Sequence, residues 1–510
     1  MTDLSNPYAG NALAAALRAV SAGREGALFA EAGARRMDYA ELWAGAERAA
    51  AALVRAGVAP GDRVAVQAEK SLEAVQLYLG AVLAGAAFLP LNTAYTPAEI
   101  GYFLRDAEPT VFVCDPARRE ATAAAAAGVP SVLTLGADGA GSWAEAVAAE
   151  GPGFRAVARG EGDLACILYT SGTTGRSKGA MLTHGNLRSN AEVLREYWRF
   201  TAEDRLIHAL PIFHAHGLYV ALNVTLMAGG SLIFMAKFDA DAVIAALPRA
   251  TALMGVPTFY TRLLGHPGLT RELCRGVRLF VSGSAPLLPE THREWRERTG
   301  HAILERYGMT ETSMNASNPY EGERRPGTVG FPLPGVELRV CGPDGAVLPA
   351  GEVGSLQVRG PNVFKGYWRM PEKTAEEFTE DGFFVTGDMA VIDAEGYVSI
   401  VGRAKDMVIS GGYNVYPREV EEIIDEIPGV AESAVIGLPH PDFGEGVAAV
   451  VAVAPGAEVT EATVRAALEG RLAGYKRPRA VFVVAELPRN TMGKVLKAEL
   501  RKTYADAFTG

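Results

Sequence analysis

Apolar and polar stretches alternate regularly along most of the chain. Short apolar runs such as DRVAVQ, TVFVC, DLACILYT and RLFVSG are separated by amphipathic stretches such as SLEAVQLYLGAVLAG. Apolar runs bounded by turn residues are typical of buried strands, and amphipathic stretches between them are typical of helices that cover a sheet. The pattern therefore predicts a large, multi-layered α/β domain from the N-terminus to about residue 401.

The pattern changes twice towards the C-terminus. Between about residues 328 and 401, Gly and Pro break up short strand-like runs, and the PDG in VELRVCGPDGAVLPAGEVG is typical of a turn. After GRAKD, helices are expected near residues 417–426 and 461–473, with strands at ESAVIGLP, GVAAVVAVAP and RAVFVVAEL. We therefore expect a β subdomain that closes the large domain, followed by a small α+β domain of about 100 residues.

Composition narrows the class of protein. The 510 residues carry a net charge of −10, which argues against a surface that neutralises nucleic-acid phosphates, so no nucleic-acid partner is expected. No stretch approaches the roughly 20 apolar residues that cross a bilayer, and the first residues lack the pattern of a secretory leader. We therefore expect a cytoplasmic protein without a membrane partner. The cysteines form no CxxC pair and are expected to be buried free thiols: Cys114, Cys166, Cys274 and Cys341.

A loop rich in Gly, Ser and Thr follows the apolar run DLACILYT. Glycines allow a tight backbone whose N–H groups face an anion, and the hydroxyls and Lys178 supply further phosphate contacts. A Walker A loop needs GxxxxGK[ST], but Ser177 precedes Lys178 and Gly179 follows it, so that interpretation fails. We expect a different polyphosphate loop, made by Thr170, Ser171, Gly172, Thr173, Thr174, Gly175 and Lys178.

A series of motifs follows in order along nearly the whole chain: YTSGTTGRSKGAM, LPIFHAHGL, VSGSAPL, ERYGMTET, TGD, GRAKDMVISGGYNVYPREVE and LPRNTMGK. In this set and order, the chain resembles the adenylate-forming family of acyl-CoA synthetases, luciferases and peptide-synthetase adenylation domains. The resemblance implies an AMP-binding domain at residues 1–402, a hinge at 403–406 and a mobile C-terminal domain at 407–510. It also implies two half-reactions: a carboxylic acid attacks the α-phosphate of ATP, with Mg²⁺ as cofactor, and coenzyme A then takes the acyl group from AMP.

The resemblance implies roles for individual residues. Lys494 in LPRNTMGK matches the family's lysine that bridges the carboxylate and the α-phosphate. Thr310 and Glu311 in ERYGMTET match a phosphate contact and the Mg²⁺ ligand, a hard carboxylate oxygen that suits this ion. Asp388 and Arg403 match the pair that holds the ribose. The other expected nucleotide contacts are Ser284, Ala285, Pro286, Glu305, Arg306, Gly308 and Tyr307, on whose ring adenine would stack.

The second half-reaction requires the small domain to rotate, and the resemblance places the hinge at Lys405. The SGGYN segment would then face the pantetheine arm of coenzyme A through Gly411 and Gly412. Lys476 and Arg477 in GYKRPR are candidate contacts for the phosphates of coenzyme A, although basic clusters at helix ends are often only solvated.

Longer strings, including LMGVPTFYTRLL, SNPYEG and PNVFKGYWRMPEKT, are similar to those of malonyl-CoA synthetases, which implies malonate as the acid. A short dicarboxylate needs a cation for its second carboxylate, because a bare buried charge is costly. Arg262 is our candidate for that cation, with His214, Ser282 and Met309 as further substrate contacts. Ala215 stands where relatives tend to have threonine, which leaves room for methylmalonate.

Other interpretations stay open at this point. The chain is alternatively a ligase for another short or aromatic acid, or an adenylating enzyme that loads a separate carrier protein. A non-catalytic nucleotide-binding protein is disfavoured because Lys494, Glu311 and Asp388 are all present. Small molecules are the expected partners of a monomer or weak homo-oligomer.

Overall fold

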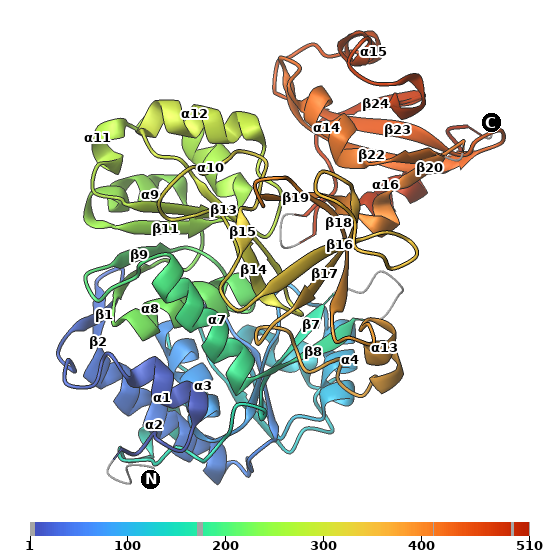
Figure 1. The fold of residues 1–510 in the computed structure, drawn as a ribbon. Helices are drawn as coiled ribbons and strands as arrows, with labels where there is room; N and C mark the ends of the chain where they lie inside the picture. Colours follow the sequence, from blue (N-terminus) through green and yellow to red (C-terminus); the bar gives the residue numbers. More distant parts are fainter. Residues whose placement is uncertain (1–5, 171–176, 412, 491–493, 509–510) are drawn as a thin grey trace.

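The computed structural model describes residues 6–170, 177–411, 413–490 and 494–508. Figure 1 shows a large body and, above it on the right, a smaller C-terminal domain drawn in orange and red. Sheets and helices alternate through the large body, so the predicted α/β class is confirmed.

The largest sheet runs through the large body. Its strands lie in the following spatial order: β15 (Phe331–Pro332), β14 (Ser313–Ser317), β13 (Leu304–Met309), β12 (Leu279–Ser282), β11 (Ala252–Gly255), β9 (Arg205–His208), β10 (Ser231–Phe234), β1 (Leu28–Ala32) and β2 (Arg35–Asp38). The strands from β13 to β1 pair in parallel, and β2, β14 and β15 add antiparallel edges. Strands β11 and β12 are buried along their whole length, as parallel strands covered on both faces should be.

A second sheet of the large body carries the strands that flank the phosphate loop. Its strands lie in the order β6 (Ser131–Thr134), β5 (Val111–Cys114), β3 (Arg63–Gln67), β4 (Ala87–Pro90), β7 (Leu164–Thr170) and β8 (Lys178–Thr183). The strands from β6 to β7 are parallel, whereas β8 returns antiparallel to β7. Thr170 at the end of β7 and Lys178 at the start of β8, two of the predicted phosphate contacts, therefore lie opposite each other at one edge of the sheet.

Helices cover these sheets. They are α1 (Ala12–Arg18), α2 (Tyr39–Arg55), α3 (Leu72–Leu83), α4 (Pro97–Ala107), η1 (Pro116–Arg118), α5 (Arg119–Thr122), α6 (Ser142–Ala148), α7 (His184–Tyr197), η2 (His216–Leu222), α8 (Asn223–Ala228), α9 (Ala240–Ala246), η3 (Leu247–Arg249), α10 (Pro257–Leu264), α11 (Arg271–Cys274), α12 (Pro289–Thr299) and α13 (Pro371–Glu376). Thr183 ends β8 and begins α7 with a capping box that Asn186 completes. This capping box defines where the chain turns away from the sheet after the phosphate loop.

The expected β subdomain is an antiparallel sheet of β16 (Glu337–Cys341), β17 (Gly354–Arg359), β18 (Phe384–Ile392) and β19 (Val398–Arg403), in that order. The short helix η4 (Ala404–Asp406) follows β19 and leads into the small domain. Cross-strand pairing places Asp388 of β18 opposite Arg403 of β19. The last strand of the large body thus carries one member of the predicted ribose pair, Arg403, at the first residue of the predicted hinge.

The small domain combines a five-stranded sheet with three helices. Its elements are β20 (Val408–Ser410), β21 (Tyr413–Val415), α14 (Pro417–Asp425), β22 (Val430–His440), β23 (Gly444–Val453), α15 (Glu461–Leu468), η5 (Gly474–Lys476), β24 (Ala480–Val484) and α16 (Lys497–Thr503). The predicted α+β composition is confirmed. One boundary was wrong: α15 ends at Leu468, before residue 473, because Glu469 is extended with ψ 132° and Gly470 follows with φ 74°.

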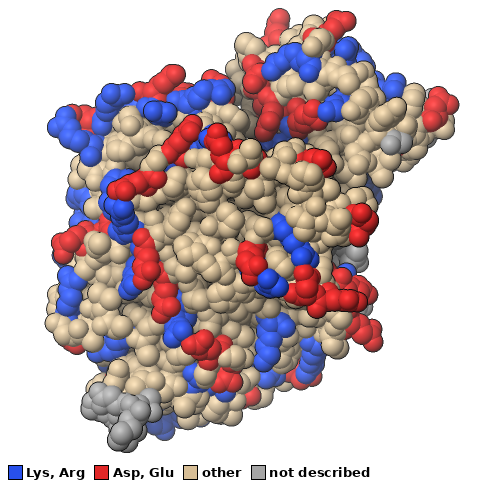
Figure 2. All heavy atoms as spheres, viewed as in Figure 1, with Lys and Arg blue, Asp and Glu red and all other residues tan. Residues whose placement is uncertain are grey.

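Charged side chains of both signs are interspersed over the face drawn in Figure 2, with tan surface between them. The cysteines are free and buried, as expected. Within the described parts of the chain, none of the helices combines the length and apolar character that a bilayer span requires.

Candidate functional site

The C-terminal lysine of the small domain reaches the large body. Lys494 lies within electrostatic reach of Arg403, Asp388, Glu311 and Arg306, all from the large body. Burial lowers the pKa of Lys494, and the positive charge of Arg403 lowers it further, whereas Asp388 and Glu311 oppose this effect. The predicted catalytic lysine therefore lies near several of the predicted nucleotide residues.

The predicted ribose pair forms a direct contact. Arg403 Nε lies 2.8 Å from Asp388 Oδ1, and the hydroxyl of Tyr307 donates to Asp388 Oδ2. Burial raises the pKa of Asp388, while Arg403 and the Tyr307 hydrogen bond lower it. Arg403 also donates to the Thr386 carbonyl at 3.1 Å. These contacts fix a carboxylate and an aromatic ring beside each other, as a nucleoside site requires.

The turn between β13 and β14 places Thr310 and Glu311 next to Tyr307. Gly308 is needed at this turn because a Cβ there would lie 1.8 Å from the Ser313 carbonyl oxygen. Ser313 itself has φ 50°, in the left-handed region. Thr310 is half-buried at the turn, and Glu311 is buried.

A chain of polar contacts links the predicted metal ligand to the predicted phosphate lysine. The hydroxyl of Tyr367 lies 2.7 Å from Glu377 Oε2 and 3.2 Å from Glu311 Oε1. Lys178 Nζ donates to Glu377 Oε1 at 2.9 Å and lies 4.1 Å from the centroid of the Tyr367 ring. Sequence reasoning missed Glu377, because nothing in AEEFTEDG distinguishes it from Glu376.

Glu311 offers the donor type that Mg²⁺ prefers. Burial raises the pKa of its carboxyl, and hydrogen bonding from Tyr367 with the charges of Arg403 and Lys178 opposes the rise. A buried carboxylate oxygen within electrostatic reach of Lys178, a predicted phosphate contact, fits a hard cation that also binds phosphate oxygens. The residues present therefore fit the ion that the sequence predicts.

Arg306 is a buried cation within β13, before the turn that joins β13 to β14. It is 3% exposed, and its Nε and one terminal nitrogen, Nη2, have no hydrogen-bond partner within the described chain. A Cβ on Gly283 would lie 2.5 Å from Arg306 Cζ, so the glycine makes room for the guanidinium. Burial lowers the pKa of Arg306 to about 9, and proximity to Tyr260 opposes this shift. An unpaired buried guanidinium is costly unless an anion joins it.

Histidines from the LPIFHAHGL segment lie near Arg306. Burial, together with the charges of Lys494 and Arg306, lowers the pKa of His214 to about 3, so this imidazole is neutral at physiological pH. His216 begins the π-helix η2, and its Nδ1 lies 3.2 Å from Ser284 Oγ. Ser284 has φ 72°, and such strained residues cluster at ligand sites.

Unpaired polar atoms recur around this histidine and serine. His216 Nε2 is buried without a partner among the described residues, and so is the hydroxyl of Ser282, two positions before Ser284. Met309 is half-buried, with its sulfur 4.0 Å from the Tyr307 hydroxyl. The predicted substrate residues other than Arg262 therefore lie in or near β13 and the end of β12. They are His214, Ser282 and Met309.

Arg262 lies apart from the other predicted substrate residues, on the surface of its helix. It is exposed in the last turn of α10, where water competes for its guanidinium. The buried cation near Lys494 and His214 is instead Arg306, which the sequence motifs suggested as a nucleotide contact. Periodicity on a short helix did not distinguish an exposed arginine from a buried one.

The remaining predicted residues are placed as follows. Thr170 ends β7, and its hydroxyl is 3.4 Å from the Lys178 carbonyl oxygen, while Ala285 and Pro286 are exposed after Ser284. Ser171, Gly172, Thr173, Thr174, Gly175 and Gly412 lie outside the described residues.

The predicted coenzyme A and hinge residues lie in and before the small domain. Lys405 is exposed within η4, and Gly411 adopts φ 60° and donates to the Phe443 carbonyl at 2.9 Å. Lys476 pairs with Glu419 at 2.5 Å, so its charge is largely compensated within the domain. The contact of Lys476 with coenzyme A stays a prediction.

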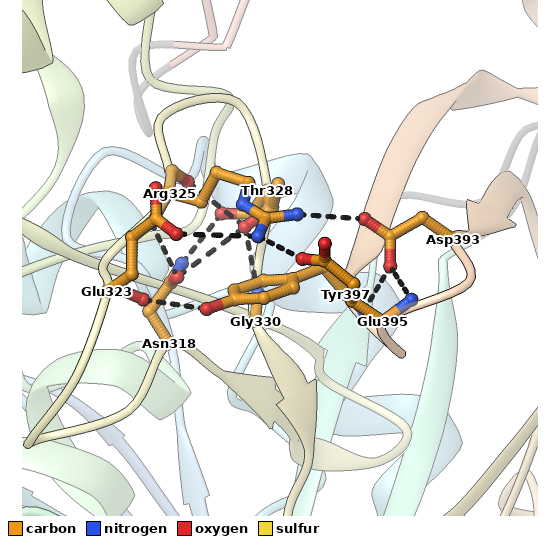
Figure 3. A network of polar contacts seen from close by, with 8 residues as sticks. All are labelled: Asn318, Glu323, Arg325, Thr328, Gly330, Asp393, Glu395 and Tyr397. Carbon is orange, nitrogen blue, oxygen red and sulfur yellow. Dashed lines mark hydrogen bonds and ion pairs between the residues drawn. The ribbon is translucent and has the colours of Figure 1, made fainter.

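A polar network joins the loop after β14 to the turn between β18 and β19 (Figure 3). Arg325 pairs with Asp393 at 3.0 Å and with Glu395, and its guanidinium carbon lies 3.9 Å from the centroid of the Tyr397 ring. Asn318 donates to the Glu305 carbonyl at 3.2 Å. The loop after β14 is thus fastened both to the β18–β19 turn and to the strand that carries the nucleotide motif.

The large α/β body and the small C-terminal domain are the architecture expected of an adenylate-forming enzyme, and the predicted ribose pair, the predicted metal ligand Glu311 and Lys494 lie within electrostatic reach of one another. Residues 17–368 match the family model described as AMP-binding enzyme, and residues 419–494 match the AMP-binding enzyme C-terminal domain. The chain belongs to the AMP-binding enzyme family, and its similarity to CoA ligases makes it an AMP-forming acyl-CoA synthetase.

Similar proteins act on different acids. A crystal structure of ATP-bound MatB from Rhodopseudomonas palustris superimposes with a TM-score of 0.95 at 58% identity, covering 97% of this chain and 99% of that one. A feruloyl-CoA synthase from Amycolatopsis is 38% identical over 92% of this chain and 95% of its own length. A malonate–CoA ligase from Arabidopsis thaliana is 36% identical over 88% of this chain and 79% of its own length.

Proposed function

We propose that this synthetase is a malonate–CoA ligase. It would convert malonate, ATP and coenzyme A into malonyl-CoA, AMP and diphosphate through malonyl-adenylate. The observation that carries the proposal is the buried guanidinium of Arg306, which has unpaired nitrogens and lies in electrostatic reach of Lys494 and His214. The similarity to a malonate–CoA ligase supports the same acid, while the comparable similarity to a feruloyl-CoA synthase makes a direct test necessary.

The argument for a dicarboxylate is electrostatic. A monocarboxylate uses its only carboxylate at the α-phosphate and leaves Arg306 buried and unpaired. A malonate molecule has a second carboxylate one methylene away, which a planar guanidinium grips through two hydrogen bonds. Since a buried unpaired cation costs several kcal/mol, this pairing favours the dicarboxylate over a neutral acyl chain. The neutral His214 lies on the same side and adds no competing charge.

In the first half-reaction, a malonate oxygen bonds to the α-phosphorus of ATP as the bond to diphosphate breaks. Lys494 would bridge the reacting carboxylate and the α-phosphate, where negative charge accumulates. Asp388 and Arg403 would hold the ribose, and Lys178 would contact the phosphates. Glu311 would bind Mg²⁺, which supplies positive charge to the phosphate oxygens.

In the second half-reaction, the sulfur of coenzyme A bonds to the acyl carbon and AMP leaves. We propose that residues 407–510 rotate about 403–406, so that Lys494 leaves the cleft and Gly411 and Gly412 approach the pantetheine arm. Ala215 is buried next to His214 and His216, and its small side chain leaves room for the extra methyl group of methylmalonate.

The proposal is tested by AMP release in the presence of coenzyme A, with malonate, methylmalonate, succinate, acetate, benzoate and ferulate compared at equal concentration. The wild-type chain should prefer malonate, and Arg306→Gln should reduce kcat/KM for malonate by about 30-fold or more, since truncating one partner of a buried charge pair costs about 2–5 kcal/mol. Arg262→Ala, at an exposed position, should change it much less. A preference for acetate or ferulate in the wild type, with no malonate turnover, would replace malonate by that acid.

A further inference from the structure

An arginine at the start of the small domain contacts the large body. Arg418 lies in the first turn of α14, and its side chain is 15% exposed. One terminal nitrogen, Nη1, donates to the Ile400 carbonyl oxygen of β19 at 2.7 Å. Its Nε donates to Glu422 Oε1 at 2.8 Å within α14, which orients the guanidinium towards the large body. A charged hydrogen bond therefore crosses the domain boundary on the α14 side of the hinge.

The same guanidinium lies near a buried carboxyl of the nucleotide motif. Burial raises the pKa of Glu305 to about 8, and the positive charge of Arg418 opposes this rise, which places the two groups within electrostatic reach. Glu305 Oε1 also accepts from the Gly327 backbone at 3.3 Å. Arg418 is thus coupled to β13, whose turn carries the residues that would bind ATP.

We propose that Arg418 is a positioning residue that holds the small domain in the arrangement required for adenylation. The proposal rests on the AMP-forming acyl-CoA synthetase activity and on rotation about the hinge, but not on the identity of the acid. Rotation would separate the Arg418 guanidinium from the Ile400 carbonyl and from Glu305, so these contacts stabilise only the arrangement that inserts Lys494.

Another ion pair next to the hinge behaves differently. Arg501 of α16 pairs with Asp406 of η4 at 2.8 Å, at the junction with the small domain. When rotation takes place at Lys405, both members move with the small domain, so this pair does not favour either arrangement. Arg418 differs because its acceptor, the Ile400 carbonyl, stays with the large body.

The test measures the two half-reactions separately in the full-length chain. Arg418→Met keeps the aliphatic stem but removes the donors, and Arg418→Lys restores a positive charge with one compact donor group. Arg471→Met is the matched control, because Arg471 pairs with Glu426 at 2.7 Å on the surface of the same domain, with 47% of its side chain exposed. Adenylation is followed as single-turnover diphosphate release without coenzyme A, and thioester formation as the reaction of synthetic acyl-adenylate with coenzyme A.

Arg418→Met should slow adenylation by about ten-fold, since a hydrogen bond from a charged donor is worth at least that factor in an equilibrium between two arrangements. The thioester step should be unchanged or faster, Arg418→Lys should recover part of the loss, and Arg471→Met should match the wild type. Equal slowing of both steps in Arg418→Met and in Arg418→Lys would show that Arg418 contributes only to folding. Unchanged adenylation in Arg418→Met would refute the positioning role. A wild type that turns over another acid but not malonate would refute the proposed substrate while leaving this test intact with that acid.

Discussion

Replacing Glu377 with glutamine tests whether the protein itself organises the phosphate side of the cleft before ATP binds. Lys373 Nζ lies 3.2 Å from Glu377 Oε1. The two shorter contacts to this carboxylate come from two donors: Lys178 Nζ at 2.9 Å on Oε1 and the Tyr367 hydroxyl at 2.7 Å on Oε2. Glutamine keeps the size but loses the charge, and its NH₂ group would face one of these two donors. With the amide oxygen on Lys178, the NH₂ group would donate to the Tyr367 hydroxyl, whose own proton would then turn to Glu311. The charged hydrogen bond from Lys178 would become a neutral one, and the change would reach Glu311 through Tyr367.

The magnitude follows from the burial of the pair. A hydrogen bond to a charged group contributes about 1.5–3 kcal/mol when it is shielded from water. The side chains of Lys178 and Glu377 are 16% and 20% exposed, so solvent screening removes a modest part of this. Lys178 also keeps its contact with the Tyr367 ring, at 4.1 Å from the centroid. A loss of about 1–2 kcal/mol then corresponds to an increase of roughly 5- to 30-fold in the KM for ATP.

The assay is AMP release at saturating acid and coenzyme A, with the concentration of ATP and Mg²⁺ varied together. The control is Glu376→Gln, which removes a neighbouring carboxylate that is 65% exposed and pairs with Lys373 at 3.0 Å. Lys373 also lies 3.2 Å from Glu377 Oε1, so both variants remove one partner of this lysine. Glu377→Gln should raise the KM for ATP and leave the KM for the acid and for coenzyme A near wild type. If Glu376→Gln has the same effect, or if Glu377→Gln acts mainly on the KM for the acid, the reasoning about Lys178 is refuted.

Three further predictions use other parts of the cleft. Lys494→Met should slow adenylation by at least about 100-fold, because an aligned charge at the reacting centre is lost, while synthetic acyl-adenylate should still react with coenzyme A; equal loss of both steps would contradict this. Gly308→Ala should lower the free energy of unfolding by about 1–3 kcal/mol, since the new Cβ meets the Ser313 carbonyl oxygen at 1.8 Å, and an unchanged melting temperature would show that the turn adapts freely. Burial raises the pKa of Glu305 to about 8 in the folded chain, above its pKa in the unfolded chain. The stability that the protonated carboxyl contributes is therefore fully present at a pH below the pKa of the unfolded chain, and it is lost as the pH rises towards 8. Relative to wild type, Glu305→Gln should therefore raise the melting temperature more at pH 8 than at pH 5. An equal shift of the melting temperature at both pH values would show that folding does not raise the pKa of Glu305.

The local pattern of apolar and polar residues predicted the architecture, because the burial of a strand or a helix determines which of its consecutive residues are apolar. The apolar run at β12 and the strand before the phosphate loop appear as strands, since covered parallel strands need continuous apolar sequence. The end of α15 was less accessible to this reasoning, because its amphipathic pattern continues past Leu468 although Gly470 adopts a left-handed conformation. The resemblance supplied Asp388 and Arg403, and their register across β18 and β19 brings them together.

Long-range pairing explains what the sequence did not reveal. Glu376 and Glu377 are neighbours at the end of α13, and only the direction of their side chains in the fold distinguishes them. The carboxylate of Glu377 contacts Lys178, nearly two hundred positions earlier in the chain. Arg306 and Arg262 are both arginines within partly apolar segments, but only the fold buries the first and exposes the second. Choosing between them from sequence would require knowing that Gly283 leaves space for a guanidinium.

The two sides of the cleft differ in how their charges are compensated, and this difference bears on selectivity. On the nucleotide side, Lys178 pairs with Glu377 and Arg403 pairs with Asp388, so protein groups hold these side chains in place before a ligand arrives. On the proposed acyl side, Nε and Nη2 of Arg306 are buried without a hydrogen-bond partner among the described residues. A site with buried polar groups rejects analogues that cannot pair with them far more strongly than an apolar pocket rejects a misfit. Under the proposed function, selectivity against monocarboxylates therefore arises from the cation that the protein leaves unpaired, whereas affinity for ATP arises from pairs that are already formed.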